Sequence, residues 1–341
     1  GTAEYLTHLV WEGAEKRYGS KRVAEDVSLR ARINHELDTI CGRLGGPDFS
    51  AYFLIVWELI GWARGVGILV GAGRGSAAGS VVSYSLQIVN VDPIKYNLLF
   101  ERFLKPGRTD MPDIDIDFQA SRRDEVIMHL QDRYGKNSVA RMGIFQIPKS
   151  PGAIKMAFKV MGLPVRIAEV ITKQIPRSQG RPDPISKLED EGYPGGATWR
   201  DEVAKAIAAD PRCGDAIELA RSFEGVVQNT GIHACGIIVT DIDLRGYIPM
   251  RLDRHAEKRD SKVQIWISQW DSKDTEAYGL LKMDALVLRN LDVADTCCQI
   301  VTASDTPISI DTLPDPDDAR NPMVRNAMAL VREGRNAGVF Q

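Results

Sequence analysis

The sequence predicts a mixed α+β fold in which a helical segment interrupts a domain of strands and helices. Residues 1–70 contain three stretches with apolar residues at helical spacing, each followed by a glycine. Strand-like patterns appear at 111–118, 233–241 and 279–288, whereas 149–181 is basic and helical in pattern. Strand-like segments on both sides of a basic helical segment indicate one domain inserted into another.

Composition excludes several classes of protein. The chain has 341 residues, 43 basic and 46 acidic, and a net charge of −3. Its five cysteines show no Cys-x-x-Cys pair, which favours reduced thiols in the cytoplasm and argues against a structural zinc site. No apolar run approaches the roughly 18 residues of a membrane span. We therefore expect a cytoplasmic chain with no membrane partner.

The motif "MPDIDIDF" at 111–118 carries the strongest chemical signal. Asp113, Asp115 and Asp117 alternate with Ile114, Ile116 and Phe118, so a strand would place all three carboxylates on one face. Same-face neighbours on a strand lie roughly 7 Å apart, so the three charges repel one another. Mg²⁺ binds carboxylate oxygens and would cancel that repulsion. The alternative is an acidic, exposed edge strand without a ligand.

A glycine-rich stretch, "VGAGRGSAAGS" at 70–80, follows an apolar strand pattern and is expected to open a helix. Gly75 and Ser76 would then lie near the helix N-terminus, where free N–H groups attract phosphate. The spacing matches neither the Walker loop nor the dinucleotide fingerprint. A tight turn without a ligand remains the alternative.

Two further features fit chemistry on a phosphate. In "GLLKMDALVL", Lys282 and Asp284 share a strand face, so the aspartate can add a metal ligand and the lysine can neutralise phosphate. Alone, the pair would be an ordinary surface ion pair. The basic segment suits a nucleic-acid backbone, although a solvated charged face is the simpler interpretation. The residues that we expect to contact DNA are Lys149, Lys155, Lys159 and Arg177. Together these features predict phosphoryl transfer assisted by two Mg²⁺ ions.

The stretch "GAGRGSAAGSVVSYSLQIVNVDPIKYNLLFERFLKPGRTDMPDIDIDF" resembles the bacterial C-family replicative DNA polymerases, the DNA polymerase III alpha subunits. The resemblance continues through "RDEVIMHLQDRYG", "NTGIHACGIIVT" and "ISQWDSKDTEAYGLLKMDALVLRNL". It implies a palm domain of the polymerase-beta nucleotidyltransferase type with an inserted, mostly helical thumb. The implied boundaries are palm at 1–146 and 226–288, thumb at 147–225, and the beginning of the fingers at 289–341.

The resemblance also implies roles for individual residues. The catalytic, metal-binding aspartates are Asp115, Asp117 and Asp284, whereas Asp113 lies outside that set. The residues expected to contact the triphosphate are Gly75, Ser76, Lys282 and Arg74. The implied activity is template-directed DNA synthesis from dNTPs on primer–template DNA, with two Mg²⁺ ions as cofactors. A sliding clamp, a clamp loader and an exonuclease subunit are partners of the full-length family.

The chain departs from the family at "IFQIPKSPGAIKMAFKVMG", 144–162, where Pro148 and Pro151 enter and would disturb a helix outside its first turn. From the resemblance we expect the family's PHP domain and most of its fingers to lie outside this sequence. We therefore expect little polymerisation by this chain alone. A catalytically silent DNA-binding module and a template-independent nucleotide-adding enzyme are the alternatives. His233 is either a nucleotide or DNA contact or a core histidine.

Overall fold

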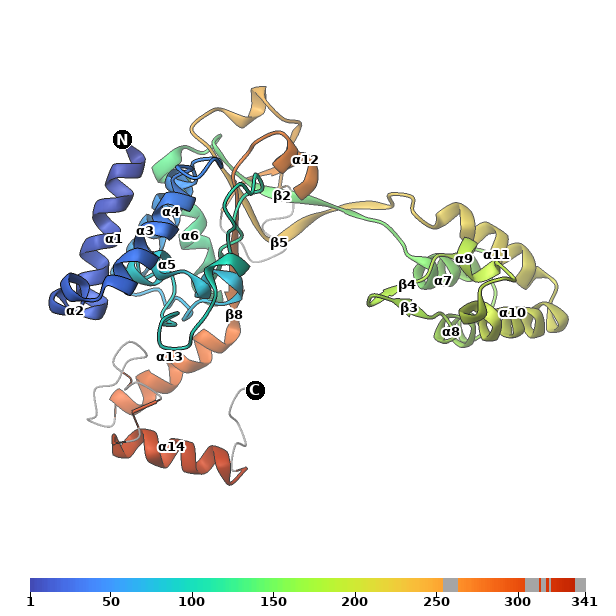
Figure 1. Cartoon of the computed structure of the whole chain (residues 1–341). Helices are drawn as coiled ribbons and strands as arrows, with labels where there is room; N and C mark the ends of the chain where they lie inside the picture. The colour runs from blue at the N-terminus through green and yellow to red at the C-terminus, as the bar shows by residue number, and fades with distance from the viewer. Residues whose placement is uncertain (254–262, 304–312, 314–316, 319, 335–341) are drawn as a thin grey trace. The chain divides into compact units, whose positions relative to one another are not determined.

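The computed structural model describes residues 1–253, 263–303, 313, 317–318 and 320–334 (Figure 1). The chain forms two compact units, one from Gly1–Met142 and His233–Gln341, the other from Gly143–Ile232. It leaves the first unit within strand β2 (Val139–Gln146) and returns within strand β5 (Asn229–Val239). The last seven residues, which include the final part of the expected fingers, lie outside the described residues.

Helices fill the N-terminal part of the first unit, as the sequence predicts. They are α1 (Thr2–Tyr18), α2 (Ser20–Glu25), α3 (Val27–Ile40) and α4 (Ser50–Gly65), the blue ribbons in Figure 1. Apolar side chains at helical spacing, such as Leu6 and Val10 of α1, are fully buried. A side chain at Gly13 of α1 would clash with the backbone carbonyl of Ser85, so glycine lets α1 approach the short helix α5 (Val81–Ser85).

A six-stranded mixed sheet forms the other layer of the first unit. Its strand order is β1-β8-β5-β2-β7-β6. The remaining strands are β1 (Asp115–Gln119), β6 (Met250–Leu252), β7 (Trp266–Ser268) and β8 (Lys282–Leu288). Strand β8 runs parallel to β1 and antiparallel to β5. The strands expected near 111–118, 233–241 and 279–288 are therefore confirmed, although β1 begins only at Asp115.

Helix α6 (Arg123–Tyr134) packs an apolar stripe of Val126, Ile127 and Leu130 into the main core. It is tied to α4 by His129, whose ring stacks on Trp62 at a centroid distance of 3.9 Å. The other helical segments are η1 (Gly75–Gly79), η2 (Phe100–Arg102), η3 (Ala120–Arg122), η5 (Leu244–Gly246), α12 (Ser272–Ala277), α13 (Arg289–Thr302) and α14 (Pro322–Arg332). None of the helices in the described ranges combines the length and apolar character needed to cross a bilayer.

The second unit is mostly helical and has its own core. It contains α7 (Ser150–Val160), α8 (Val165–Lys173), a hairpin of β3 (Arg177–Ser178) and β4 (Arg181–Pro182), α9 (Ile185–Glu189), η4 (Pro194–Gly196), α10 (Ala197–Ala209) and α11 (Arg212–Phe223). Trp199 and Phe158 are among its fully buried side chains. Pro151 lies in the first turn of α7, where proline removes no helical hydrogen bond. The proline therefore leaves this helix intact.

Candidate active site

The parallel pairing of β1 with β8 brings two distant carboxylates together. Asp115 lies directly opposite Asp284 in the register. Ile116 and Phe118 are buried on the other face of β1, at 3% and 1% exposure, which fixes the direction of the alternating acids. Two segments far apart in sequence thus place their carboxylates side by side on one face of the sheet.

A cluster of three carboxylates forms at this point. Among the described residues, Asp113, Asp115 and Asp284 each offer an oxygen, and these oxygens lie within 4.8 Å of one another. Asp113 precedes β1 and is exposed, whereas Asp284 is buried. Burial, and then the charges of Asp284 and Asp115, raise the pKa of Asp113. The cluster includes Asp113, which the resemblance leaves outside the catalytic set.

Asp117 is held by a cation instead. The Nε atom of Arg74 lies 3.2 Å from Oδ2 of Asp117 and 4.0 Å from Oδ2 of Asp115. Asp117 is only 6% exposed, and its Oδ1 has no hydrogen-bond partner among the described residues. Burial raises the pKa of Asp117, and the charge of Arg74 opposes that rise. One oxygen of the Asp117 carboxylate is therefore paired with Arg74, and the other has no partner among the described residues.

Asp284 repeats this arrangement with a different cation. The ammonium of Lys282 lies 2.9 Å from Oδ2 of Asp284. Oδ1 of Asp284 is buried and has no partner in the described part of the chain. Burial pulls the pKa of Lys282 down, but the hydrogen bond to Asp284 and the charges of Asp284, Asp113 and Glu276 together outweigh burial, so the pKa is raised. Lys282 therefore stays protonated beside the carboxylate cluster.

The glycine-rich loop lies against the same acids. The N–H of Gly71 donates to the carbonyl of Asp117 at 2.8 Å, which ties the loop to β1. A Cβ added at Gly71 would lie 3.0 Å from Cβ of Asp117, and one added at Gly75 would lie 3.4 Å from Oδ2 of Asp115. A larger residue at Gly71 would therefore press against Asp117, whereas at Gly75 the positive φ of 68° is what favours glycine.

The expected helix after this loop is much shorter than the pattern suggests. Gly75 and Ser76 begin the five-residue 3₁₀ helix η1, and five-residue α5 follows after Ser80. Such short segments sum few aligned peptide dipoles, so any attraction of phosphate to Ser76 would come from the free N–H groups of the turn, and this role of Ser76 stays a prediction. Ser76 is exposed, and its neighbour Gly75 lies close to Oδ2 of Asp115.

A buried ion pair, missed in the sequence, holds this turn in place. Glu36 of α3 is 0% exposed and accepts hydrogen bonds from Oγ of Ser80 at 2.8 Å and from the N–H of Val82 at 3.1 Å. Arg32 donates to Glu36 at 2.6 Å and to the carbonyls of Gly79 and Leu98. A glutamate inside the apolar stripe of α3, four residues after an arginine, was the available signal.

Comparison with known proteins identifies the family. The family described as "Bacterial DNA polymerase III alpha NTPase domain" matches residues 4–287. The chain belongs to this bacterial DNA polymerase III alpha family. It is 37% identical to the DNA polymerase III subunit alpha of Thermus aquaticus over 335 residues, which is 97% of this chain and 25% of the relative.

Two other DNA polymerase III alpha subunits show the same pattern of coverage. The subunit of Mycobacterium tuberculosis is 38% identical over 346 residues, covering 99% of this chain and 27% of the relative. The subunit of Escherichia coli is 32% identical over 349 residues, covering all of this chain and 28% of the relative. The chain thus spans about a quarter of the length of the alpha subunits that it matches.

In this member of the polymerase III alpha family, His233 lies on β5, three residues before the residue that pairs with Asp284. Its Nδ1 accepts hydrogen bonds from the N–H of Cys235 at 3.2 Å and of Gly236 at 2.7 Å, and Gly236 lies opposite Asp284 in the sheet. Because Nδ1 is an acceptor, Nε2 carries the hydrogen of the neutral imidazole. His233 is half-buried, with a donor atom not used by these two bonds.

The four basic residues expected to contact DNA all lie in the second unit and are exposed: Lys149, Lys155, Lys159 and Arg177. Lys149 precedes α7, and Lys155 and Lys159 follow on that helix. Lys155 lies 4.0 Å from Glu169 of α8, a separation at which an exposed pair contributes little. Their side chains are accessible to a polyanion, and their role in DNA binding stays a prediction.

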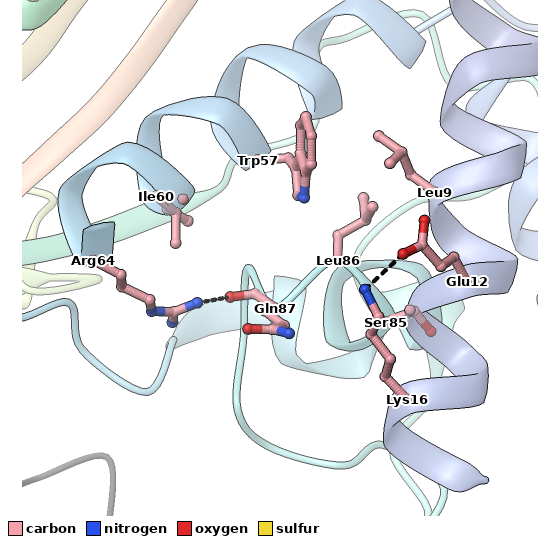
Figure 2. A pocket seen from close by; sticks show the side chains of 11 residues that line it. Leu9, Glu12, Lys16, Trp57, Ile60, Arg64, Ser85, Leu86 and Gln87 are labelled. Carbon is pink, nitrogen blue, oxygen red and sulfur yellow. Dashed lines mark hydrogen bonds and ion pairs between the residues drawn. The ribbon is translucent and has the colours of Figure 1, made fainter. Parts of the chain in front are cut away.

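A hollow of about 400 Å³ lies apart from the carboxylates, between α1, α4 and α5 (Figure 2). Trp57 and Leu86 are among its apolar lining residues. Its lining includes two polar contacts, in which Lys16 donates to Glu12 at 2.6 Å and Arg64 donates to the carbonyl of Gln87 at 2.7 Å. None of the residues predicted to carry the chemistry lines this hollow, so it is not part of the candidate active site.

Proposed function

We propose that this chain is the catalytic part of a replicative DNA-directed DNA polymerase, which transfers nucleotides from dNTPs to a primer 3′-hydroxyl on a DNA template. One observation carries the proposal. The β1–β8 register sets Asp115 beside Asp284, and the cations Arg74 and Lys282 stand on the neighbouring carboxylate oxygens. Membership of the polymerase III alpha family supports it.

The proposal extends to the domains. A palm of the polymerase-beta nucleotidyltransferase type is assigned to 1–146 and 226–288, most of which lies in the first compact unit. The second unit corresponds to the inserted thumb at 147–225, and the chain from 289 onward begins the fingers. The mixed sheet of the first unit and the separate helical core of the second support this assignment.

The carboxylates suit Mg²⁺. The donor set is all oxygen, and the buried Oδ1 atoms of Asp117 and Asp284 lack partners among the described residues, so each can accept a cation. We assign Asp115, Asp117 and Asp284 as the residues that would hold two Mg²⁺ ions. Bound there, the ions supply charge neutralisation at the phosphate and activation of the primer hydroxyl.

The remaining groups bind and orient the substrates. Arg74 and Lys282 are placed to neutralise triphosphate oxygens, and the Gly75–Ser76 turn lets the nucleotide approach the acids closely. The exposed basic residues of the second unit bind the phosphate backbone of primer–template DNA. In the whole protein, a sliding clamp, a clamp loader and an exonuclease subunit would act with this part.

Primer extension with Mg²⁺ tests the proposal. The chain is compared with a form extended by the segment that follows the matched region in a relative, each with and without Asp284→Asn. Because Asn keeps the size but removes the negative charge that holds the metal, the extended form should lose at least about 100-fold in rate. Asp110→Asn is the matched control, because Asp110 is exposed and lies just before the motif at 111–118. This variant should retain the rate. DNA binding without extension, the same for wild type and Asp284→Asn, would instead establish a catalytically silent DNA-binding module.

A further inference from the structure

In each of the two most buried carboxylates of the site, one oxygen is paired with a cationic side chain and the other is not. Asp117 has Oδ2 against Arg74 and Asp284 has Oδ2 against Lys282, while Oδ1 of each has no partner among the described residues. Arg74 and Lys282 thus compensate charges that divalent ions are proposed to compensate. Leaving a buried carboxylate without a counter-charge is strongly unfavourable. Arg74 or Lys282 can therefore leave its carboxylate only when another cation takes its place.

The carboxylates of the site are not equally available to a divalent ion. Asp113, Asp115 and Asp284 already converge, with oxygens within 4.8 Å of one another, and the orphaned Oδ1 of Asp284 is available to a ligand. Asp117 is outside this group, and Arg74 holds it. One divalent ion can therefore bind to the three converging carboxylates without any change at Asp117. A second ion that needs Asp117 must compete with Arg74.

Arg74 is suited to exchange partners, and Lys282 is less so. The Arg74 side chain is 46% exposed and projects from the loop, whereas Lys282 is 21% exposed and lies on β8 between Asp284 and Glu276. A guanidinium binds phosphate oxygens in a bidentate manner, and a triphosphate carries several negative charges against the single charge of Asp117. An arriving triphosphate can therefore draw Arg74 away from Asp117.

We propose that Arg74 couples nucleotide binding to the second metal ion. It neutralises Asp117 while the site is empty of nucleotide, and it releases Asp117 to a divalent ion when the triphosphate takes its guanidinium. Asp113 completes the ion site that exists before the nucleotide arrives. This inference rests on the proposed nucleotidyl-transfer function and adds an order of assembly to it. Because coupling is reciprocal, the ion must also raise the affinity for the nucleotide.

Mn²⁺ binding, counted by electron paramagnetic resonance on the 341-residue chain, tests the order without any catalysis. Wild type should bind one ion alone and two with a non-hydrolysable dNTP analogue. Arg74→Gln should bind two ions without the analogue, with the affinity for the second raised about tenfold by loss of the competing charge. The analogue should then change ion binding by no more than about twofold.

Three further variants separate the coupling from general charge effects. Arg74→Lys keeps the charge and should restore part of the coupling. Arg43→Gln removes the same charge from an exposed pair with Asp38 and should match wild type. Asp113→Asn should weaken the nucleotide-independent ion by about tenfold and spare the other. Circular dichroism confirms that each variant is folded.

The inference is overturned if wild type binds both ions without nucleotide, or if Arg74→Gln keeps the one-ion and two-ion states of wild type. Neither result touches the proposed function, which the Asp284→Asn primer-extension comparison decides. If wild type binds no Mn²⁺ in either condition, both the coupling and the assigned metal ligands are wrong.

Discussion

Removing the carboxylate of Glu36 should release the turn that carries Gly75 and Ser76. Glu36 is fully buried, and three donors converge on it: Arg32, Ser80 and the N–H of Val82. Glu36→Ala leaves the hydroxyl and the N–H without acceptors, each at about 1–3 kcal/mol, and removes the counter-charge of Arg32. We expect the free energy of unfolding to fall by about 3–5 kcal/mol.

Glu36→Gln tests which part of the carboxylate contributes. Burial raises the pKa of Glu36, and the hydrogen bonds from Arg32, Val82 and Ser80 oppose that rise. An amide keeps one acceptor oxygen in nearly the same volume. The loss should therefore shrink to about 1–2 kcal/mol.

Guanidinium unfolding followed by circular dichroism gives the stability difference, and hydrogen exchange at 79–86 shows whether the turn itself loosens. Asp38→Ala is the matched control. It lies on the same helix and loses the same charge, but from an exposed pair with Arg43 that contributes at most about 1 kcal/mol. If Glu36→Ala costs no more than Asp38→Ala, or if exchange at 79–86 is unchanged, the buried pair does not hold the turn.

Two further changes test the loop and the second unit. Gly73 has φ of 91°, and an added Cβ would lie 2.5 Å from Cγ1 of Val89, so Gly73→Ala should cost about 2–4 kcal/mol in denaturant unfolding. Gly107→Ala, with φ of 76° but no heavy atom within 4 Å of the added Cβ, should cost only about 1–2 kcal/mol, and equal losses would refute the clash. In the second unit, hydrogen bonds from Tyr193, and then from Ser178 and Lys187, lower the pKa of Asp183. A lowered pKa gives stability that is present above the unfolded value of about 3.9 and is lost as pH falls below it. Asp183→Asn should therefore be less stable than wild type at pH 7, and this difference in stability should be smaller near pH 3. A difference in melting temperature, measured by circular dichroism, that does not change with pH would contradict this.

Where periodicity determines geometry, the sequence predicted which side chains share a face of a strand. Alternation of acids with Ile116 and Phe118 indicates which face of β1 carries carboxylates, because the opposite face must be buried. The shared face of Lys282 and Asp284 follows in the same way, and their 2.9 Å contact agrees with it. These predictions needed only a strand and a core, both of which the apolar pattern supplies.

Details that depend on long-range packing were beyond the sequence. Whether Asp113 or Asp117 joins Asp115 and Asp284 depends on where β1 begins and on which acid Arg74 reaches, and neither has a periodic signal. The burial of Glu36 depends on η1 and α5 packing against α3. Local patterns report propensity and faces, whereas counter-charge pairing is set by tertiary contacts.

Charge balance explains why this site should be complete only with its ligands. Four carboxylates, Asp113, Asp115, Asp117 and Asp284, lie around two cationic side chains, Arg74 and Lys282, so negative charge remains in excess. A triphosphate alone would add negative charge and could not remain bound with the acids uncompensated. Divalent ions alone would have to compete with Arg74 for Asp117. Only when ions and triphosphate are both present can the carboxylates bind the ions while Arg74 and Lys282 bind the phosphate oxygens. The Arg74 variants measure that exchange of partners directly.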